Sequence, residues 1–308
     1  MQPNKGIYPR EWDQQNKAGM SKQFDTHRLN DLVAMLRPER RTRIVDVGAN
    51  PINENPYLKL LQSGHAEVWG FEPNPVAFAR LAETDTEHYF PHAVGDGSKQ
   101  TLYITKAPAF TSLYRPNATV FGHLGQMGRA STVLEEVEIE TRALDDIPGL
   151  PDFDLLKIDV EGAETLVFEG AKDKLSRAVA VISEVAFLPL SMGQPLLDEQ
   201  MRILRGHGFD FQKFLGLSNF TIRGPLAVHL SPAHHRDQAV NGDASFLRSL
   251  LAPEAIETEQ LKHMAILCDA VLNSFALVAR CLEFLIARDV TTTSRAIQYL
   301  KQVPHSAD

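Results

Sequence analysis

Apolar and polar positions divide the chain into three parts, of which the first is a helical lead-in. Residues before 42 are mostly polar until a set of apolar side chains recurs at helical spacing, namely Phe24, Leu29, Leu32, Val33 and Leu36. This spacing predicts an amphipathic helix. Pro38 ends it, because proline disfavours helical backbone in the residue before it. We assign residues 1–42 to this lead-in.

The second part, residues 43–250, alternates short β-branched runs with helical patterns. The runs that predict strands are 43–47, 67–71, 88–94, 155–160 and 179–184, with a further strand after Gly208. The helices expected between them are 56–63, 75–83, one that ends near Gly170, and 197–207. Two of them start with an asparagine cap and a proline, at Asn55-Pro56 and Asn74-Pro75. This alternation predicts an α/β protein with a Rossmann-like, doubly wound parallel sheet.

Residues 98–150 interrupt the alternation of strands and helices. Two segments of alternating polarity, 101–105 and 137–142, flank an irregular stretch that contains several glycines. Because half-buried strands alternate in this way, we predict a β-hairpin insertion with a long loop. Long loops often carry function. We therefore expect residues 106–136 to take part in the choice of substrate.

The third part, residues 251–308, is predicted to be a helical C-terminal extension. Its apolar residues form a heptad-like seam of Leu261, Met264, Cys268, Val271, Phe275, Val278, Leu282 and Leu285. Other faces are apolar too, at Ile266, Leu267, Leu272, Leu277 and Ile286, which favours a helix buried on several sides. A homodimer formed through this helix is the alternative.

Composition and charge narrow the class of protein. The chain has 308 residues, 44% of them hydrophobic, and a net charge of -8, which suits a globular protein and argues against binding to nucleic acid. The two cysteines, Cys268 and Cys281, fit a reducing compartment. Neither a signal peptide nor a membrane span is apparent, so we expect a cytoplasmic protein. The histidines show no zinc-like spacing, and no metal ligands are assigned.

Acidic residues follow the predicted strands at the sheet edge where ligands bind in doubly wound folds. Asp46 ends the first strand and precedes Gly48, which lets the backbone turn closely under a ligand. Glu72 comes 26 residues after Asp46, at the distance where an acid can bind ribose hydroxyls. A single glycine excludes the glycine-rich phosphate loop of dinucleotide enzymes, which counts against a nicotinamide-dependent oxidoreductase. The pattern suits a nucleoside cofactor without phosphates, of which S-adenosylmethionine is the common example.

The later strand ends carry further acids. Asp96 follows the third strand, where it could bind an adenine amine. Asp159 and Glu161 lie at the end of the fourth strand, and Glu184 ends the fifth. Crowding of these three carboxylates raises at least one pKa unless a cation intervenes. They are our candidates for a catalytic base, and a magnesium ion that bridges Asp159 and Glu184 is the alternative.

Five ordered motifs resemble those of FkbM-type methyltransferases. They are residues 44–50, 70–74, 111–113, 144–146 and 156–164, and the last, with the sequence LKIDVEGAE, is the most specific. The resemblance extends over roughly two thirds of the chain. It implies a class I methyltransferase fold, S-adenosylmethionine as cofactor, and methyl transfer to a hydroxyl of a sugar, glycan, glycolipid or polyketide-like acceptor.

The resemblance also implies roles for individual residues. It places Asp159 and Glu161 near the transferred methyl group. The residues assigned to the cofactor are Asp46, Gly48, Asn50, Glu72, Asn74, Asp96 and Ser112. One departure is Pro51, where the family has a glycine nearby; proline lacks an N–H donor, so the methionine carboxylate must be held differently. A catalytically inactive binding or scaffold protein of the same fold is the alternative function.

Overall fold

The structure is a computed structural model that describes residues 25–50, 55–125, 128–231 and 234–304. These residues form two compact units. One unit holds the helices α2 (Thr26–Leu36), α3 (Leu58–Gln62), α9 (Thr258–Ala270), α10 (Phe275–Ala287) and α11 (Thr293–Leu300). The other unit holds the strands and the remaining helices, and it contains every residue assigned to the site.

The helical unit confirms the predicted amphipathic helix. Asp25 caps helix α2: its side chain accepts hydrogen bonds from two backbone N–H groups of the first turn, and the apolar face of the helix is buried. Phe24, which was predicted to belong to this helix, lies outside the described residues. Within the unit, the buried Arg28 guanidinium donates to Asp269 over 2.8 Å, and the Tyr299 hydroxyl donates to the same carboxylate over 2.5 Å. Because Arg28, Asp269 and Tyr299 come from α2, α9 and α11, this buried ion pair and hydrogen bond connect the three helices.

The C-terminal extension is helical and buried on several sides, as predicted, but the expectation of one continuous helix is wrong. Helix α9 ends at Ala270 and α10 begins at Phe275. Between them Asn273 adopts a left-handed conformation with φ of 47°, and the Ser274 N–H donates to the Cys268 carbonyl over 2.7 Å. Asparagine tolerates this conformation better than most residues, so it allows the chain to turn and the two helices to pack on each other.

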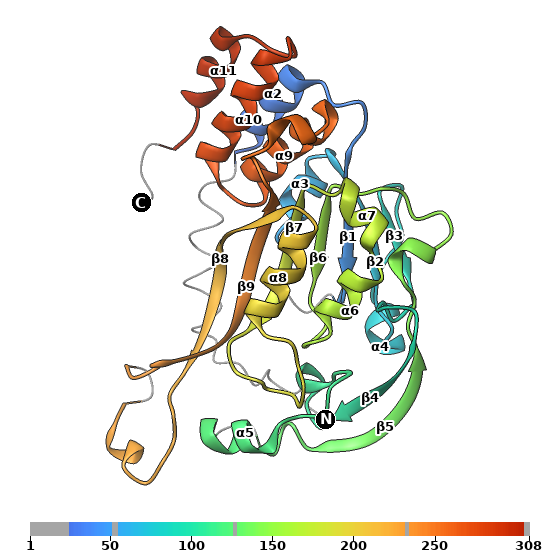
Figure 1. The fold of residues 1–308 in the computed structure, drawn as a ribbon, viewed down its shortest axis with the longest axis vertical. Helices are drawn as coiled ribbons and strands as arrows, with labels where there is room; N and C mark the ends of the chain where they lie inside the picture. Colours follow the sequence, from blue (N-terminus) through green and yellow to red (C-terminus); the bar gives the residue numbers. More distant parts are fainter. Residues whose placement is uncertain (1–24, 51–54, 126–127, 232–233, 305–308) are drawn as a thin grey trace. The chain divides into compact units, whose positions relative to one another are not determined.

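The larger unit is built on a seven-stranded sheet in the order β3-β2-β1-β6-β7-β9-β8 (Figure 1). Strands β1 (Thr42–Val47), β2 (Ala66–Phe71), β3 (Glu87–Phe90), β6 (Leu155–Ile158) and β7 (Ala180–Ala186) are parallel. Strand β9 (Gln238–Arg248) runs antiparallel between β7 and β8 (Phe209–Phe220). The predicted α/β class is confirmed, and the order reverses between β1 and β6, where such sheets bind ligands.

Strand β9 is not predicted by the sequence pattern. Its centre is Asn241-Gly242-Asp243, a combination that usually indicates a turn. In the sheet, a Cβ atom at Gly242 would lie 2.4 Å from the Gly216 carbonyl oxygen. The glycine therefore permits a close approach of β8, whose pairing with β9 is irregular around Gly216.

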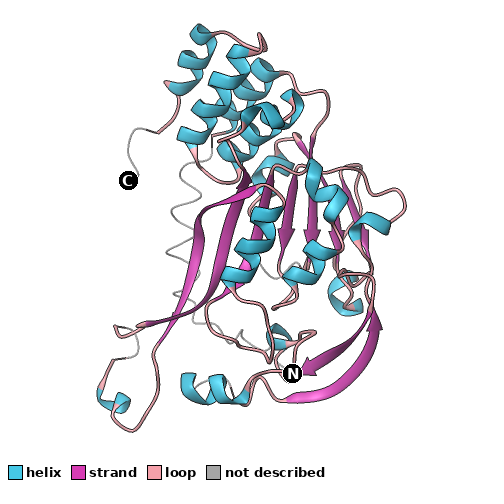
Figure 2. Ribbon diagram, in the orientation of Figure 1, coloured by secondary structure: helices cyan, strands magenta, loops and turns pink. Residues whose placement is uncertain are grey.

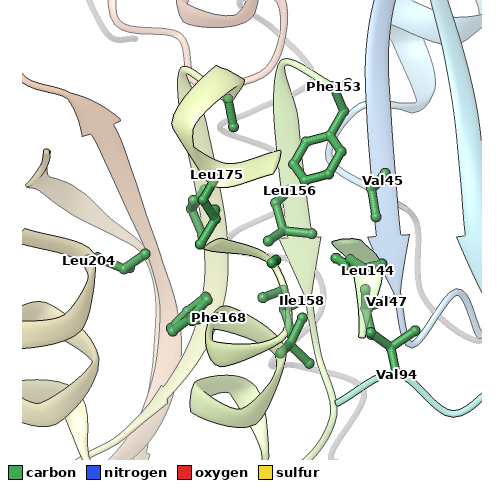
Figure 3. Packing of buried hydrophobic residues seen from close by; sticks show 14 of the residues in the cluster. Val45, Val47, Val94, Leu144, Phe153, Leu156, Ile158, Phe168, Leu175 and Leu204 are labelled. Carbon is green, nitrogen blue, oxygen red and sulfur yellow. The ribbon is translucent and has the colours of Figure 1, made fainter. Parts of the chain in front are cut away.

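Three helices cover one face of the sheet, namely α6 (Glu164–Glu169), α7 (Lys172–Arg177) and α8 (Leu197–Gly206) (Figure 2). The hydrophobic core lies between them and the strands, with Leu156 and Ile158 of β6 close to Phe168 of α6 (Figure 3). Burial of such side chains contributes about 1.5–3 kcal/mol each. Because the core packs along β6, it holds the end of that strand, and the acids that follow it, in a defined position.

Two predicted helices are shorter than expected. The helix predicted from residue 56 begins only at Leu58, with Tyr57 at its N-cap: residues 56 and 57 form a turn, and the first helical hydrogen bond runs from the Leu61 N–H to the Tyr57 carbonyl. Asn74 does cap α4 (Pro75–Phe78), but that helix ends at Phe78 instead of residue 83. The Arg80 and Leu81 N–H groups bond three residues back, which tightens the chain into turns.

The predicted β-hairpin insertion is confirmed. Strands β4 (Lys99–Thr105) and β5 (Val133–Glu140) pair antiparallel as a separate two-stranded sheet. The segment between them contains a short helix that the sequence pattern did not predict, α5 (Ala118–Leu124), capped by the Asn117 side chain. In Figure 1 this insertion lies at the edge toward which β1 and β6 point. It therefore lies beside the predicted site.

Candidate active site

The ends of β1 and β6 pack directly against each other at Gly48. This residue has φ of +84°, and a Cβ atom on it would lie 2.0 Å from the Asp159 carbonyl oxygen. Only glycine combines that backbone conformation with so close a contact. The turn after β1 therefore packs directly against the first residue of the loop after β6.

Lys157 of β6 connects two of the predicted site acids. Its Nζ atom lies 3.1 Å from Asp46 Oδ1 and 4.0 Å from Asp159 Oδ2. Burial alone would lower the pKa of Lys157, but the two carboxylates outweigh that effect and raise it. Asp46 is fully buried. Its carboxylate thus forms a buried ion pair with Lys157 at the ends of β1 and β6.

Glu72 and Asn74 form a small hydrogen-bonded corner after β2. Glu72 is almost fully buried, and its Oε1 atom accepts from the Asn74 N–H over 2.8 Å. Burial raises the pKa of Glu72, partly offset by that hydrogen bond. The Asn74 side chain accepts from the Val76 and Ala77 N–H groups. It caps α4, and it acts on the site by holding the backbone beside Glu72.

The other assigned cofactor residues differ in how they are engaged. Asp96 accepts through Oδ1 from the N–H and hydroxyl of Ser98, and these hydrogen bonds lower its pKa. By contrast, Asn50 Oδ1 is buried and has no hydrogen-bond partner among the described residues. A buried acceptor of this kind is costly unless something donates to it. Asn50 is therefore the residue here whose local contacts call for a ligand.

The loop after β6 forms a turn at Glu161 that several hydrogen bonds hold in place. Glu161 has φ of 57° and Gly162 φ of 108°. The Ser112 hydroxyl donates to the Glu161 carbonyl over 2.7 Å, and Glu164 Oε1 accepts from the Val160 and Gly162 N–H groups. Left-handed conformations are costly for a residue with a Cβ and persist only where the surroundings hold them. Ser112, from the insertion, and Glu164 provide that support.

Three carboxylates meet beyond this turn. Oxygens of Asp159, Glu161 and Glu184 all lie within 4.8 Å of one another, a spacing that could hold a metal ion. Asn241 of β9 donates through Nδ2 to Glu184 Oε1 over 2.6 Å. Desolvation, followed by repulsion among the acids, raises the pKa of Glu161 and Glu184 well above the usual range. The predicted crowding at the ends of neighbouring strands is thus present.

A hollow of about 360 Å³, part of it open to solvent, lies against two of these carboxylates. Its lining residues are Phe110, Ser112, Pro116, Phe121, Glu161, Glu184, Ala186, Leu190, Ser191, Gln194 and Asn241. One part is apolar, and Phe110 and Phe121 meet edge to face with ring centroids 5.2 Å apart. The carboxylates and Asn241 supply the polar part. A mixed lining of this kind is typical of small-molecule sites.

Sequence reasoning missed several of these residues. Asn241 lies in the strand that was not predicted, and Phe110 and Phe121 lie in the loop of the insertion. Glu164 belongs to the 156–164 motif, so its position gave a signal, but its role in holding the Glu161 turn depends on hydrogen bonds that spacing does not show. Pro51, the departure from the family pattern, lies outside the described residues.

The buried Glu164 carboxyl predicts a pH-dependent stability. Desolvation, partly offset by its backbone hydrogen bonds, raises its pKa to about 7. The folded state therefore binds a proton more tightly than the unfolded state, and the free energy of unfolding decreases as pH rises from about 4.5 to about 7. Glu164→Gln keeps an acceptor oxygen but cannot titrate. Between pH 5 and pH 8 we expect its free energy of unfolding to decrease by about 1–3 kcal/mol less than that of the unaltered chain.

Urea unfolding at pH 5 and pH 8 measures this effect. Glu169→Gln, at an exposed position on the same helix, is the matched control, and its pH dependence should equal that of the unaltered chain. An unchanged pH dependence in Glu164→Gln would contradict the assignment.

The fold and the site together define a class of protein. The sheet is parallel except for one reversed strand, β9, which lies next to its edge. Acids stand at successive strand ends, and there is no glycine-rich phosphate loop. This is the arrangement of class I methyltransferases. The model for the methyltransferase FkbM domain matches residues 46–211, more than half of the chain. The chain belongs to the FkbM methyltransferase family, and it is an S-adenosylmethionine-dependent methyltransferase. The alternative of a nicotinamide-dependent oxidoreductase does not agree with this family.

Individual relatives are more distant. The 2-O-methyltransferase NoeI of Sinorhizobium fredii is 26% identical over 193 residues, which cover 57% of this chain and 76% of NoeI. A putative methyltransferase from Thermoplasma acidophilum is 8% identical, with a TM-score of 0.34 over 68% of this chain and 70% of the other. A putative tRNA (m1A22) methyltransferase of Streptococcus pneumoniae, in complex with S-adenosyl-L-methionine, is 12% identical, with a TM-score of 0.33 over 92% of this chain and 100% of the other.

Among the described helices, none combines the length and the apolar character required to cross a bilayer.

Proposed function

We propose that the enzyme transfers the methyl group of S-adenosylmethionine to a hydroxyl of a sugar, glycan, glycolipid or polyketide-like acceptor. The observation that carries this proposal is the pair of partly buried carboxylates, Glu161 and Glu184, in the wall of the hollow. A hydroxyl is a poor nucleophile, so its methylation benefits from a base with a raised pKa. The name of the Sinorhizobium fredii relative, a 2-O-methyltransferase, supports transfer to oxygen.

The residues at the ends of β1 and β2 fit the cofactor. S-adenosylmethionine supplies, when bound, an electrophilic methyl group on a positively charged sulfur. The buried Asn50 Oδ1 offers an acceptor to a donor group, and Glu72 offers a carboxylate at the position where ribose hydroxyls bind in related sheets. Asp46, Asn74 and Ser112 support these positions through Lys157, the Glu72 corner and the Glu161 turn. Asp96 completes the proposed set.

Glu184 is our choice for the base. Asn241 donates to one of its oxygens, which fixes the carboxylate in the wall of the hollow, and desolvation together with the neighbouring carboxylates raises its pKa, which makes it a stronger base than an exposed glutamate. In the proposed reaction the acceptor oxygen forms a bond to the methyl carbon, the carbon–sulfur bond breaks, and Glu184 takes the hydroxyl proton. Glu161 lies beside it, with a carboxylate oxygen within 4.8 Å of one of Glu184. The Asp159 carboxylate lies 4.0 Å from Lys157 Nζ.

A magnesium ion that bridges Asp159 and Glu184 is the alternative way to activate the hydroxyl, supported by the spacing of the three carboxylates. We expect turnover to persist after dialysis against EDTA, because a general base such as Glu184 can accept the hydroxyl proton without a cation. The measurement is methyl transfer before and after dialysis. Loss of turnover that magnesium restores would assign the bridging ion instead.

Cofactor binding provides the direct test of the proposed function. Calorimetric titration with S-adenosylmethionine and S-adenosylhomocysteine should show binding to the unaltered chain. We expect Glu72→Ala to weaken it by about 10- to 100-fold, which is what loss of hydrogen bonds to a charged group costs. Glu83→Ala, an exposed acid in the segment after α4, is the control and should bind normally.

Two outcomes would count against this proposal. Equal affinities of the unaltered chain and Glu72→Ala would remove Glu72 from the cofactor site. Failure of the unaltered chain to bind either compound would favour a catalytically inactive protein that retains the fold.

A further inference from the structure

The wall of the hollow contains two carboxylates, and the proposed reaction uses only one of them. Glu161, from the turn after β6, and Glu184, from β7, both line the hollow, whereas Asp159 is not among its lining residues. Carboxylate oxygens of the two glutamates lie within 4.8 Å of each other. If Glu184 takes the hydroxyl proton, Glu161 has no part in that step, although it faces the same space.

Both glutamates have a carboxylate oxygen to which no described residue donates a hydrogen bond. Asn241 donates to Glu184 Oε1 over 2.6 Å, which leaves Glu184 Oε2 free to accept. At Glu161 the hydrogen bond from Ser112 goes to the backbone carbonyl, and within the described part of the chain nothing donates to the carboxylate. A partly buried charge without a donor is costly, and a ligand that brings donors removes that cost.

A single hydroxyl cannot donate to both carboxylates, because it has only one O–H group. Two hydroxyls on neighbouring carbon atoms can do so. In a gauche staggered arrangement their oxygens lie about 3 Å apart. Each can then donate to its own carboxylate over about 2.7 Å. Two such hydrogen bonds, side by side, fit oxygens of Glu161 and Glu184 that lie no more than 4.8 Å apart.

We propose that the acceptor carries a second hydrogen-bond donor on the carbon next to the methylated hydroxyl, and that Glu161 binds this donor. The assignment rests on the proposed methyl transfer to oxygen, and it narrows the acceptor to a vicinal diol, as in a sugar ring, or a vicinal amino alcohol. The reacting oxygen takes the methyl group, its proton passes to Glu184, and the second donor stays unchanged. Phe110 and Phe121 provide the apolar part of the hollow for the carbon skeleton.

Methyl transfer to a panel of methyl pyranosides tests this proposal. For each pyranoside that is methylated, three counterparts change the neighbouring positions in turn: the deoxy compound lacks the group, the O-methyl compound keeps the oxygen without a donor, and the amino compound keeps a donor. We expect kcat/KM to fall about 100-fold or more for the deoxy and O-methyl compounds, because the carboxylate then lacks its donor. The diol and the amino compound should both react, and their relative rates distinguish a hydroxyl from an ammonium group.

Glu161→Ala connects this preference to Glu161. The ratio of kcat/KM for the diol to kcat/KM for its deoxy counterpart should shrink by about tenfold or more. Glu161→Gln, which keeps a neutral acceptor oxygen, should give an intermediate ratio. Glu169→Gln, exposed on α6, is the matched control and should keep the ratio of the unaltered chain. Because both acceptors are compared on the same variant, the ratio does not depend on how much of that variant is folded.

Three results would overturn the proposal. They are a deoxy or O-methyl compound methylated as efficiently as its diol, a ratio that Glu161→Ala leaves unchanged, and a chain that binds S-adenosylmethionine but methylates only compounds with an isolated hydroxyl or none of the panel. Cofactor binding is measured separately, by the calorimetric titration described above. Its absence would remove the proposed function itself, so the two failures are distinguishable.

Discussion

Glu184→Gln is expected to lower kcat by about 10²- to 10⁴-fold, the range over which general bases contribute to catalysis. Glutamine keeps the shape of the side chain and an oxygen that can accept from Asn241 Nδ2, so the wall of the hollow should stay intact. The change removes the group that takes the proton. Because Glu184 lies in the wall of the hollow, whereas Asn50 and Glu72 lie at the ends of β1 and β2, affinity for S-adenosylmethionine should be nearly unchanged.

The pH dependence of the unaltered enzyme provides a second measurement of the same role. A base must be ionised, so kcat should rise with pH through the raised pKa of the carboxylate pair and then level off. Methyl transfer to a hydroxyl acceptor, followed over a range of pH, measures both the loss of rate in Glu184→Gln and the pH dependence of the unaltered enzyme. Glu169→Gln is the control. A Glu184→Gln enzyme that retains full turnover would transfer the role to Glu161 or Asp159, each of which can be tested by the same replacement.

Gly48→Ala is expected to destabilise the larger unit by about 2–6 kcal/mol, the sum of two separate effects. The left-handed backbone at φ of +84° strains any residue with a Cβ, and that Cβ would lie 2.0 Å from the Asp159 carbonyl oxygen. The ends of β1 and β6 would have to separate. Because Asp159 is part of the carboxylate group, activity should fall together with stability.

Gly97→Ala separates the two effects. Gly97 has φ of +87°, but a Cβ there would meet Ala143 at an ordinary 3.7 Å. It should therefore show the backbone strain alone, about 1–3 kcal/mol. Urea denaturation of both variants measures the difference. Equal losses of stability would show that the close contact at Gly48 relaxes without cost.

Much of the sheet could be predicted because its parallel strands are short, apolar and separated by helical segments. In β1, β2 and β7 the predicted runs agree with the structure within two residues at either end. The lengths of α3 and α4 could not be predicted. Propensity and capping indicate where a helix can begin, as Asn74 does, but the surrounding packing decides where it ends.

The candidate site shows the same division. The sequence determined that acids lie at the ends of β1, β2, β6 and β7, because strands of a parallel sheet all end at one edge. Only the tertiary structure decided how each acid is engaged: Asp46 is neutralised by Lys157, Glu164 holds a turn, and Glu184 accepts from Asn241. These contacts join segments far apart in the chain, and β9 even places a turn-like sequence inside a strand. Local periodicity carries no information on such contacts, since they depend on which backbones approach closely enough to meet.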